Sequence, residues 1–146
     1  MDGVPTLFME LTINYLGGHR FETVARHHQL VSDQPPEDNG SDGGATPSEL
    51  FLFSLATCAG YYAAQYLNAR ALPSEQLAVH ISAHKGDRPA RFTSITLNVS
   101  APGLNKHHRD GILRAVESCL ISNTLIHPPT LDVKISSAPV EAYALA

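Results

Sequence analysis

The sequence predicts an α+β fold built on antiparallel sheets. Segments that alternate apolar and polar residues come in pairs, each pair precedes a stretch with helical spacing, and no regular strand-helix-strand alternation runs through the chain. The expected order is therefore strand, strand, helix, strand, strand, helix, strand. At 146 residues the chain is expected to form a single domain, residues 1–146, without internal repeats.

The first two expected strands form a hairpin. Residues 4–16 are rich in β-branched and aromatic types, Gly17-Gly18 provides a two-residue turn, and residues 20–32 form the return strand. Residues 33–45 contain Pro, Gly, Asp, Asn and Ser, with no apolar residue before Ala45. This composition indicates a loop, either an ordered binding loop or one whose middle is mobile, and we expect the mobile form.

A helix start follows the loop. Thr46 suits the N-cap, Pro47 the first helical position, and Glu49 the third, which together form a capping box. The helix is expected to run to about residue 70 or 71, because Pro73 disfavours a helical residue before it. Its length would be about 36 Å at 1.5 Å per residue.

This first helix is apolar on every face. The 20 residues between Glu49 and Arg70 carry no charge, but three tyrosines, several polar residues and the lack of a basic flank argue against a membrane span. A globule of this size is only about 38 Å across, so one small sheet can cover one side of the helix. We therefore expect an obligate homodimer with this helix at its centre.

The second half of the chain repeats the pattern of two strands and a helix. Residues 77–84 and 91–100 alternate in hydrophobicity and predict strands, joined by a hairpin loop at 85–90. Residues 106–126 carry apolar residues at helical spacing. Residues 131–137 predict a last, half-buried strand.

Composition excludes several functions. The net charge is −4 and Lys and Arg are scattered, so we expect neither a nucleic-acid nor a membrane-surface partner. The adjacent pairs His27-His28 and His107-His108 point apart, and no metal or other cofactor is expected. Two cysteines are too few for a secreted disulfide framework and the start has no export leader, which favours the cytoplasm.

Those two cysteines, Cys58 and Cys119, are 61 residues apart and each is expected in mid-helix on a buried face. Free cysteines can simply pack as small hydrophobes, or they can be redox-active. An ordinary thiol with a pKa of about 8.5 is only about 3% ionised at neutral pH. Cys58 lies too far inside its helix to feel the helix dipole, so activation would need a cation elsewhere in the fold. A guanidinium at ~4 Å could supply about 4 kcal/mol.

The stretch "GGATPSELFLFSLATCAG" and the later "SCLISNTL" resemble the two signatures of the OsmC/Ohr family, the osmotically inducible and organic hydroperoxide resistance proteins. The resemblance extends over about residues 14–137 and includes the order and separation of the motifs. It implies an OsmC-like intertwined homodimer, in which antiparallel sheets wrap around two long central helices and the active sites lie at the interface.

The resemblance also implies a thiol-dependent peroxidase that reduces organic hydroperoxides in oxidative stress defence. Cys58 matches the peroxidatic cysteine and Cys119 the resolving cysteine, whose disulfide an external dithiol reduces. Glu49 matches a glutamate that partners a thiol-activating arginine. Arg26 is our choice for that arginine and Arg20 is the alternative, since the loop at 33–46 contains none. The third alternative is that neither arginine reaches Cys58.

Two other functions stay open. The same dimer could be a non-catalytic protein that binds a small apolar ligand in its interface pocket, or a structural dimer whose cysteines only pack. If aromatic side chains of the first helix line the thiol pocket, the pocket favours bulky hydroperoxides over hydrogen peroxide.

Overall fold

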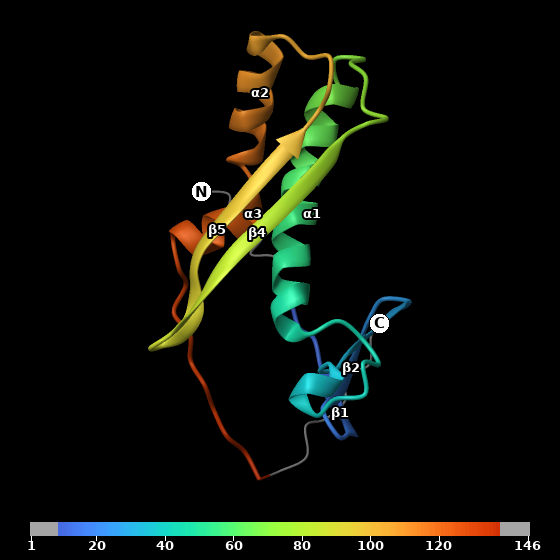
Figure 1. Ribbon diagram of the computed structural model, residues 1–146, viewed down its shortest axis with the longest axis vertical. Helices are drawn as coiled ribbons and strands as arrows, with labels where there is room; N and C mark the ends of the chain where they lie inside the picture. The colour runs from blue at the N-terminus through green and yellow to red at the C-terminus, as the bar shows by residue number, and fades with distance from the viewer. Residues whose placement is uncertain (1–8, 138–146) are drawn as a thin grey trace, which may run out of the picture. The chain divides into compact units, whose positions relative to one another are not determined.

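The computed structural model describes residues 9–137, and contacts divide the chain into two compact units. The first contains the chain up to Glu49 and from Val133 on; the second contains residues 50–132. Figure 1 labels the elements, which confirm the α+β class with antiparallel pairing. They are β1 (Ile13–Gly17), β2 (Arg20–Ala25), β3 (His28–Ser32), η1 (Pro36–Asp38), α1 (Pro47–Asn68), β4 (Ala78–Asp87), β5 (Ala90–Ser100), α2 (Lys106–Val116) and α3 (Leu120–Ile126).

The first unit contains an antiparallel meander in the order β1-β2-β3. The predicted turn at Gly17 and Gly18 is confirmed, and both residues have positive φ angles, 97° and 61°, which glycine adopts without a Cβ clash. The first strand begins only at Ile13, whereas the prediction placed it over residues 4–16. Residues 9–12 of that prediction are therefore not in a strand. Its residues 4–8 lie outside the described part of the chain.

The prediction of one return strand over residues 20–32 is wrong. The segment forms two strands, β2 and β3, joined by a tight turn in which Arg26 has a φ of 57°. The register runs from Phe21 opposite Ser32 to Ala25 opposite His28. Arginine carries no turn signal, and the segment lacks the Gly, Asn or Pro that normally marks such a turn, so the sequence pattern concealed it.

The loop before α1 is built around the buried carboxylate of Asp33, which is 1% exposed. Its Oδ1 accepts a hydrogen bond from the Gln34 N–H at 2.8 Å, and its Oδ2 accepts from Ser41 at 3.2 Å and Gly43 at 2.8 Å. These bonds lower the pKa of Asp33, the one from Gly43 most, although burial opposes them. We expected the middle of this loop to be mobile; instead the loop has a defined, hydrogen-bonded conformation.

The second unit packs α1 and α2 against the β4–β5 hairpin (Figure 1). The predicted strands 77–84 and 91–100 are confirmed and continue further, because residues 85–87 and 90 of the expected loop also pair. Along both strands half-buried residues alternate with exposed ones. The core of this unit contains Ala63, Leu67 and Ile112, with partly buried Tyr66, Leu72, Leu77, Val99, Ala101, Leu104 and Val116 packed against it.

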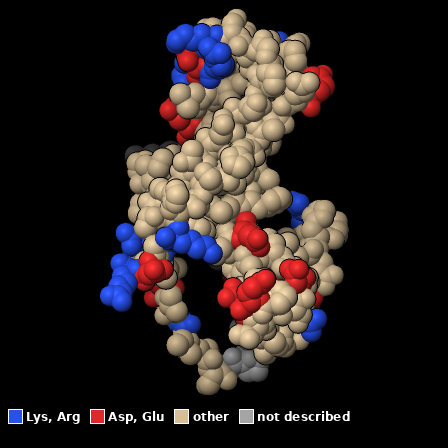
Figure 2. Space-filling view, in the orientation of Figure 1, with Lys and Arg blue, Asp and Glu red and all other residues tan. Residues whose placement is uncertain are grey.

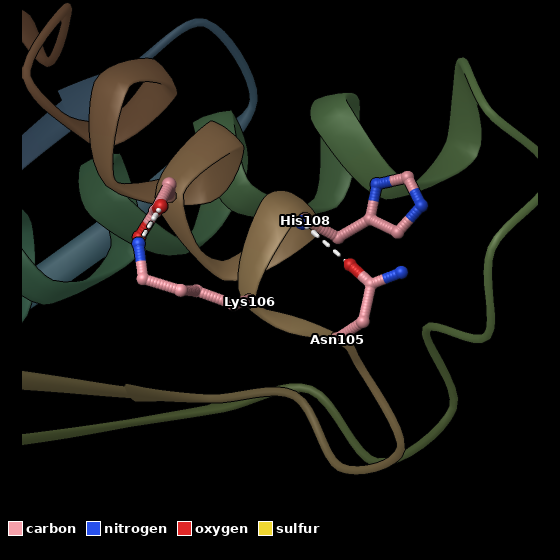
Figure 3. A network of polar contacts seen from close by, with 4 residues as sticks. Asn105, Lys106 and His108 are labelled. Atoms are coloured by element: carbon pink, nitrogen blue, oxygen red, sulfur yellow. Dashed lines mark hydrogen bonds and ion pairs between the residues drawn. The ribbon is translucent and has the colours of Figure 1, made fainter.

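The start of α2 is capped by Asn105, whose side-chain oxygen accepts a hydrogen bond from the His108 N–H at 3.0 Å (Figure 3). Lys106 Nζ pairs with Asp110 Oδ2 at 2.6 Å one turn further on. On the face in Figure 2, Lys and Arg atoms (blue) lie in separate groups rather than in one continuous basic patch.

The predicted strand 131–137 is not observed. The segment forms no strand among residues 9–137, and its alternating apolar side chains are exposed: Leu131 by 85%, Val133 by 75% and Ile135 by 98%. Alternation predicts a strand only where a partner strand and a core are available to bury one face.

Candidate functional site

Cys58 lies in the middle of α1, next to the stripe of that helix that faces the core of the second unit. The buried residues of the helix repeat every four positions: Leu55, Ala59, Ala63 and Leu67. Cys58 is half-buried beside them. The opposite face is apolar but exposed at Phe53 and Tyr61. One chain therefore covers one side of this helix, as its all-round apolar pattern predicted.

Cys119 is not in mid-helix as expected. The predicted helix 106–126 is broken into α2 and α3, and Cys119 is the N-cap of α3, with non-helical φ and ψ of −59° and 122°. Two side chains stabilise the break: Cys119 Sγ accepts from the Ser122 N–H at 3.4 Å, and Asn123 Nδ2 donates to the Glu117 carbonyl at 3.2 Å. The apolar spacing continues through the break, so periodicity could not reveal it.

The two sulfurs lie near each other within the second unit. Each affects the pKa of the other, although they are 61 residues apart in the sequence. Both thiols are free, and Cys119 is 0% exposed while Cys58 keeps some access to solvent.

Burial raises the pKa of Cys58, and the hydrogen bond to Cys119 raises it further. The backbone N–H groups of Ile121 and Leu120 oppose this rise, because they reach the Cys58 sulfur from the first residues of α3. Sequence reasoning assigned no donors to Cys58 except a distant cation. It missed these two amides because they depend on the helix break.

Cys119 behaves in the opposite way. Burial alone would raise its pKa, but the hydrogen bond from Cys58 and the side-chain and backbone bonds from Ser122 lower it, with a further backbone bond from Ile121. The resemblance implied an activated Cys58, whereas burial within this unit raises the pKa of that thiol. Ser122 is a site residue that the sequence analysis did not identify.

Glu49 forms the predicted capping box. Its Oε2 accepts from the Thr46 N–H at 2.7 Å and from Thr46 Oγ1 at 2.9 Å, while Thr46 Oγ1 accepts from the Glu49 N–H at 3.2 Å. Its catalytic role stays a prediction, because Glu49 belongs to the first unit and the thiols to the second.

The two candidate arginines also belong to the first unit. Arg26 was expected on a strand, but it lies in the β2–β3 turn. Arg20, the first residue of β2, acts on the carboxylate of Asp33, whose pKa its charge helps to lower. The pairing of Arg26, or of Arg20, with Cys58 stays a prediction.

A groove runs beside the exposed face of α1. Its volume is about 440 Å³. It is lined by Phe53, Ala56, Thr57, Gly60, Leu77, Ala78 and Val79. Apart from the hydroxyl of Thr57, these side chains are apolar or absent, so the groove suits an apolar occupant. Among residues 9–137 no group of three or more His, Cys, Asp or Glu side chains is placed to hold a metal ion, and no helix is long and apolar enough to cross a membrane.

Solved structures with the same fold include three that cover most of this chain. An OsmC-like protein from Mycoplasma pneumoniae has 17% identity and a TM-score of 0.70, over 84% of this chain and 90% of that one. An organic hydroperoxide resistance protein from Legionella pneumophila has 20% identity and a TM-score of 0.63, over 82% of this chain and 91% of that one. One from Elizabethkingia anophelis has 18% identity and a TM-score of 0.62, over 83% of this chain and 90% of that one. At these identities the likeness concerns the fold. No match was found among curated proteins.

The family model described as OsmC-like protein matches residues 40–134. This match includes the loop end, α1, the β4–β5 hairpin and both cysteines, and it extends over more than half of the chain. The chain therefore belongs to the OsmC-like protein family.

Proposed function

We propose that this protein is a thiol-dependent peroxidase that reduces organic hydroperoxides. The observation that carries the proposal is the proximity of Cys58 and Cys119, one partly exposed and the other buried. The accessible sulfur can react with a substrate. The buried sulfur beside it can then attack the oxidised cysteine, and its burial keeps it from reacting with the substrate itself. The names of two similar structures, organic hydroperoxide resistance proteins, support the same substrate class.

The chemistry needs both thiols. The deprotonated Cys58 attacks the distal oxygen of the hydroperoxide, an S–O bond forms, the O–O bond breaks, and the alkoxide leaves as an alcohol after it gains a proton. Cys119 then attacks the Cys58 sulfenic acid, an S–S bond forms, and hydroxide leaves and becomes water. An external dithiol returns the disulfide to two thiols.

Two further roles complete the proposal. Arg26, held by Glu49, would supply positive charge to Cys58 during its attack, with Arg20 as the alternative. The exposed apolar face of α1 would be covered by a second copy in a homodimer, as its exposed Phe53 and Tyr61 suggest. We place the single-domain protein in the cytoplasm, where reducing conditions keep both thiols free between turnovers.

The test is a thiol titration before and after one equivalent of cumene hydroperoxide. The expected result is a rapid loss of two thiols per chain, which Cys58→Ser abolishes while the variant keeps the wild-type circular dichroism spectrum. Hydrogen peroxide should react more slowly if the surroundings of the thiol are apolar.

The second candidate function is binding of a small apolar ligand, which the groove beside α1 favours. If a correctly folded protein loses no thiols, the peroxidase proposal is rejected and binding of an apolar ligand remains. A displaceable apolar fluorescent probe, whose binding Gly60→Leu weakens, would then support it, because Gly60 lines the groove.

A further inference from the structure

The loop before α1 contains the one Asn-Gly pair of the sequence, Asn39-Gly40. Asparagine followed by glycine is chemically labile, because glycine has no side chain to hinder its own backbone nitrogen from attacking the asparagine side-chain amide. Asn39 is exposed, so water can reach it. The sequence therefore supplies the groups for a spontaneous modification, and the conformation of the loop determines how fast they react.

The backbone favours this labile pair at these two positions. Asn39 follows η1 with a φ of 63° and a ψ of 23°, in the left-handed region that asparagine adopts more readily than most residues. A Cβ on Gly40 would overlap the backbone carbonyl of Gln34. A more stable pair of residues would therefore require a different loop.

The closed loop holds the reacting atoms apart. The Gly40 N–H donates to the Pro35 carbonyl at 3.0 Å, a bond that keeps the proton on the nitrogen. Ring closure needs this nitrogen on the same side of the Asn39 Cα–C bond as the side chain, whereas a ψ of 23° places it close to the opposite side. The loop must therefore open locally before Asn39 can react.

Asp33 holds the loop closed around this pair. Its Oδ1 accepts from the Gln34 N–H before the pair, and its Oδ2 accepts from Ser41 and Gly43 after it. The Gln34 carbonyl in turn accepts from the Asp42 N–H at 3.1 Å. Loss of the Asp33 carboxylate would remove a charged acceptor from three N–H groups at once, which lowers the free energy needed to open the loop.

We propose that Asn39 is a site of spontaneous deamidation, that the closed loop protects it, and that Asp33 sets the rate by holding the loop closed. All the residues involved belong to the first unit. The inference goes beyond the proposed peroxidase function and does not depend on it.

The reaction needs only water. In the open loop the Gly40 N–H gives its proton to hydroxide, and the nitrogen attacks Asn39 Cγ. A C–N bond forms in the resulting five-membered ring, and the side-chain nitrogen takes up a proton and leaves as ammonia. Water then opens the ring at either carbonyl and leaves aspartate or isoaspartate, with no oxidation or reduction.

The isoaspartate product carries the chain through the former side chain, which adds one atom to the backbone. Gly40 fits against the Gln34 carbonyl without room for a Cβ, so the lengthened backbone should not return to the closed conformation. Each product also adds a negative charge at residue 39. Deamidation therefore converts a transient opening of this loop into a permanent one.

The test follows deamidation of the full-length protein at mildly alkaline pH by mass spectrometry, with fragmentation to locate the change at residue 39. The wild type should react more than about tenfold slower in native buffer than in urea, since tenfold corresponds to about 1.4 kcal/mol of opening free energy. Asp33→Asn should raise the rate in native buffer about tenfold, toward the rate in urea.

Glu37→Gln is the matched control, because Glu37 is exposed in η1, two residues before Asn39, and the change removes the same charge. It should leave the rate unchanged, since the bonds to Asp33 remain. The inference is overturned if the wild type deamidates as fast in native buffer as in urea. A folded Asp33→Asn variant that reacts at the wild-type rate, or no faster than Glu37→Gln, would also overturn it.

Circular dichroism shows whether Asp33→Asn is folded. If it is not, hydrogen exchange of the Gly40 amide in the wild type decides the question. Slow exchange in native buffer supports the closed loop, because this N–H donates to the Pro35 carbonyl. Exchange as fast as in urea would overturn the inference.

Discussion

Asp33 determines the conformation of the loop that precedes α1. One carboxylate accepts three backbone N–H groups, at Gln34, Ser41 and Gly43, and so fixes both ends of a segment that has no apolar side chain to anchor it. A residue at position 44 other than glycine would clash with the Val31 carbonyl. The loop is therefore ordered by polar contacts, and its composition alone could not show this.

We predict that Asp33→Asn destabilises the protein in a pH-dependent way. The folded pKa of Asp33 lies below its ordinary value, so the carboxylate contributes stability above the ordinary pKa, and this stability is lost as the pH falls through the folded pKa. The asparagine amide lacks the negative charge of the carboxylate. Its NH2 group would also take the place of one oxygen and face backbone N–H groups, which are themselves donors. Thermal unfolding should show a lower midpoint for the variant at neutral pH and a shrinking difference in acid.

Asp42→Asn is the control for that measurement, since Asp42 is exposed on the same loop. Equal losses of stability in the two variants, or a difference that persists in strong acid, would contradict the role given to the Asp33 carboxylate.

The candidate site shows which chemistry can be predicted residue by residue. The positions of Cys58 and Cys119 followed from two local motifs, and the capping contact of Glu49 followed from its spacing to Thr46. The contribution of Ser122 could not follow in this way. It depends on a helix break that apolar periodicity does not register, because the spacing of apolar residues is the same on both sides of Cys119.

At the scale of elements, one close contact between α1 and α2 is made by Tyr66 and Gly111. The Tyr66 ring lies against the backbone of Gly111, its Oη is 3.2 Å from His108 Nδ1, and the Arg70 guanidinium stacks 3.8 Å from the ring centroid. Gly111 is buried and would be unfavourable in a helix for its own sake. Its lack of a side chain is therefore explained by the tyrosine.

We predict that Gly111→Ala costs about 1–3 kcal/mol of unfolding free energy, because the new methyl group overlaps the Tyr66 phenol. In a Tyr66→Ala background the same change should become stabilising by about 1 kcal/mol, since alanine favours the helix once the ring is gone. Chemical denaturation of the four proteins in this cycle measures both values. A loss of stability in both backgrounds would reject the explanation.

For the whole molecule, the order of strands and helices was predictable as far as the chain buries its own surface. The β4–β5 hairpin and the buried face of α1 satisfied their patterns within one unit. Residues 131–137 did not, although their alternation is as regular: Leu131, Val133 and Ile135 remain exposed. An apolar pattern in the sequence shows that a surface needs burial. It does not show whether the same chain or another chain buries that surface.

The exposed face of α1 gives the last prediction. Phe53 and Tyr61 are 66% and 60% exposed, two helical turns apart, on either side of the groove residues Thr57 and Gly60. Four glutamates introduced into a dimer by Phe53→Glu with Tyr61→Glu would lie at the proposed interface without partners, where burial of a charge is costly. Sedimentation velocity should therefore show a dimer for the wild type and a monomer for the variant at micromolar concentration.

Thr96→Glu with Ser82→Glu is the matched control. These residues pair across β4 and β5 on the exposed polar face of the hairpin, so the same number of charges is added away from α1. The control should remain dimeric, because its added charges lie away from the exposed Phe53 and Tyr61 of α1. A wild type that sediments as a monomer at every concentration, or a control that dissociates like the α1 variant, would show that this face is not where two copies meet.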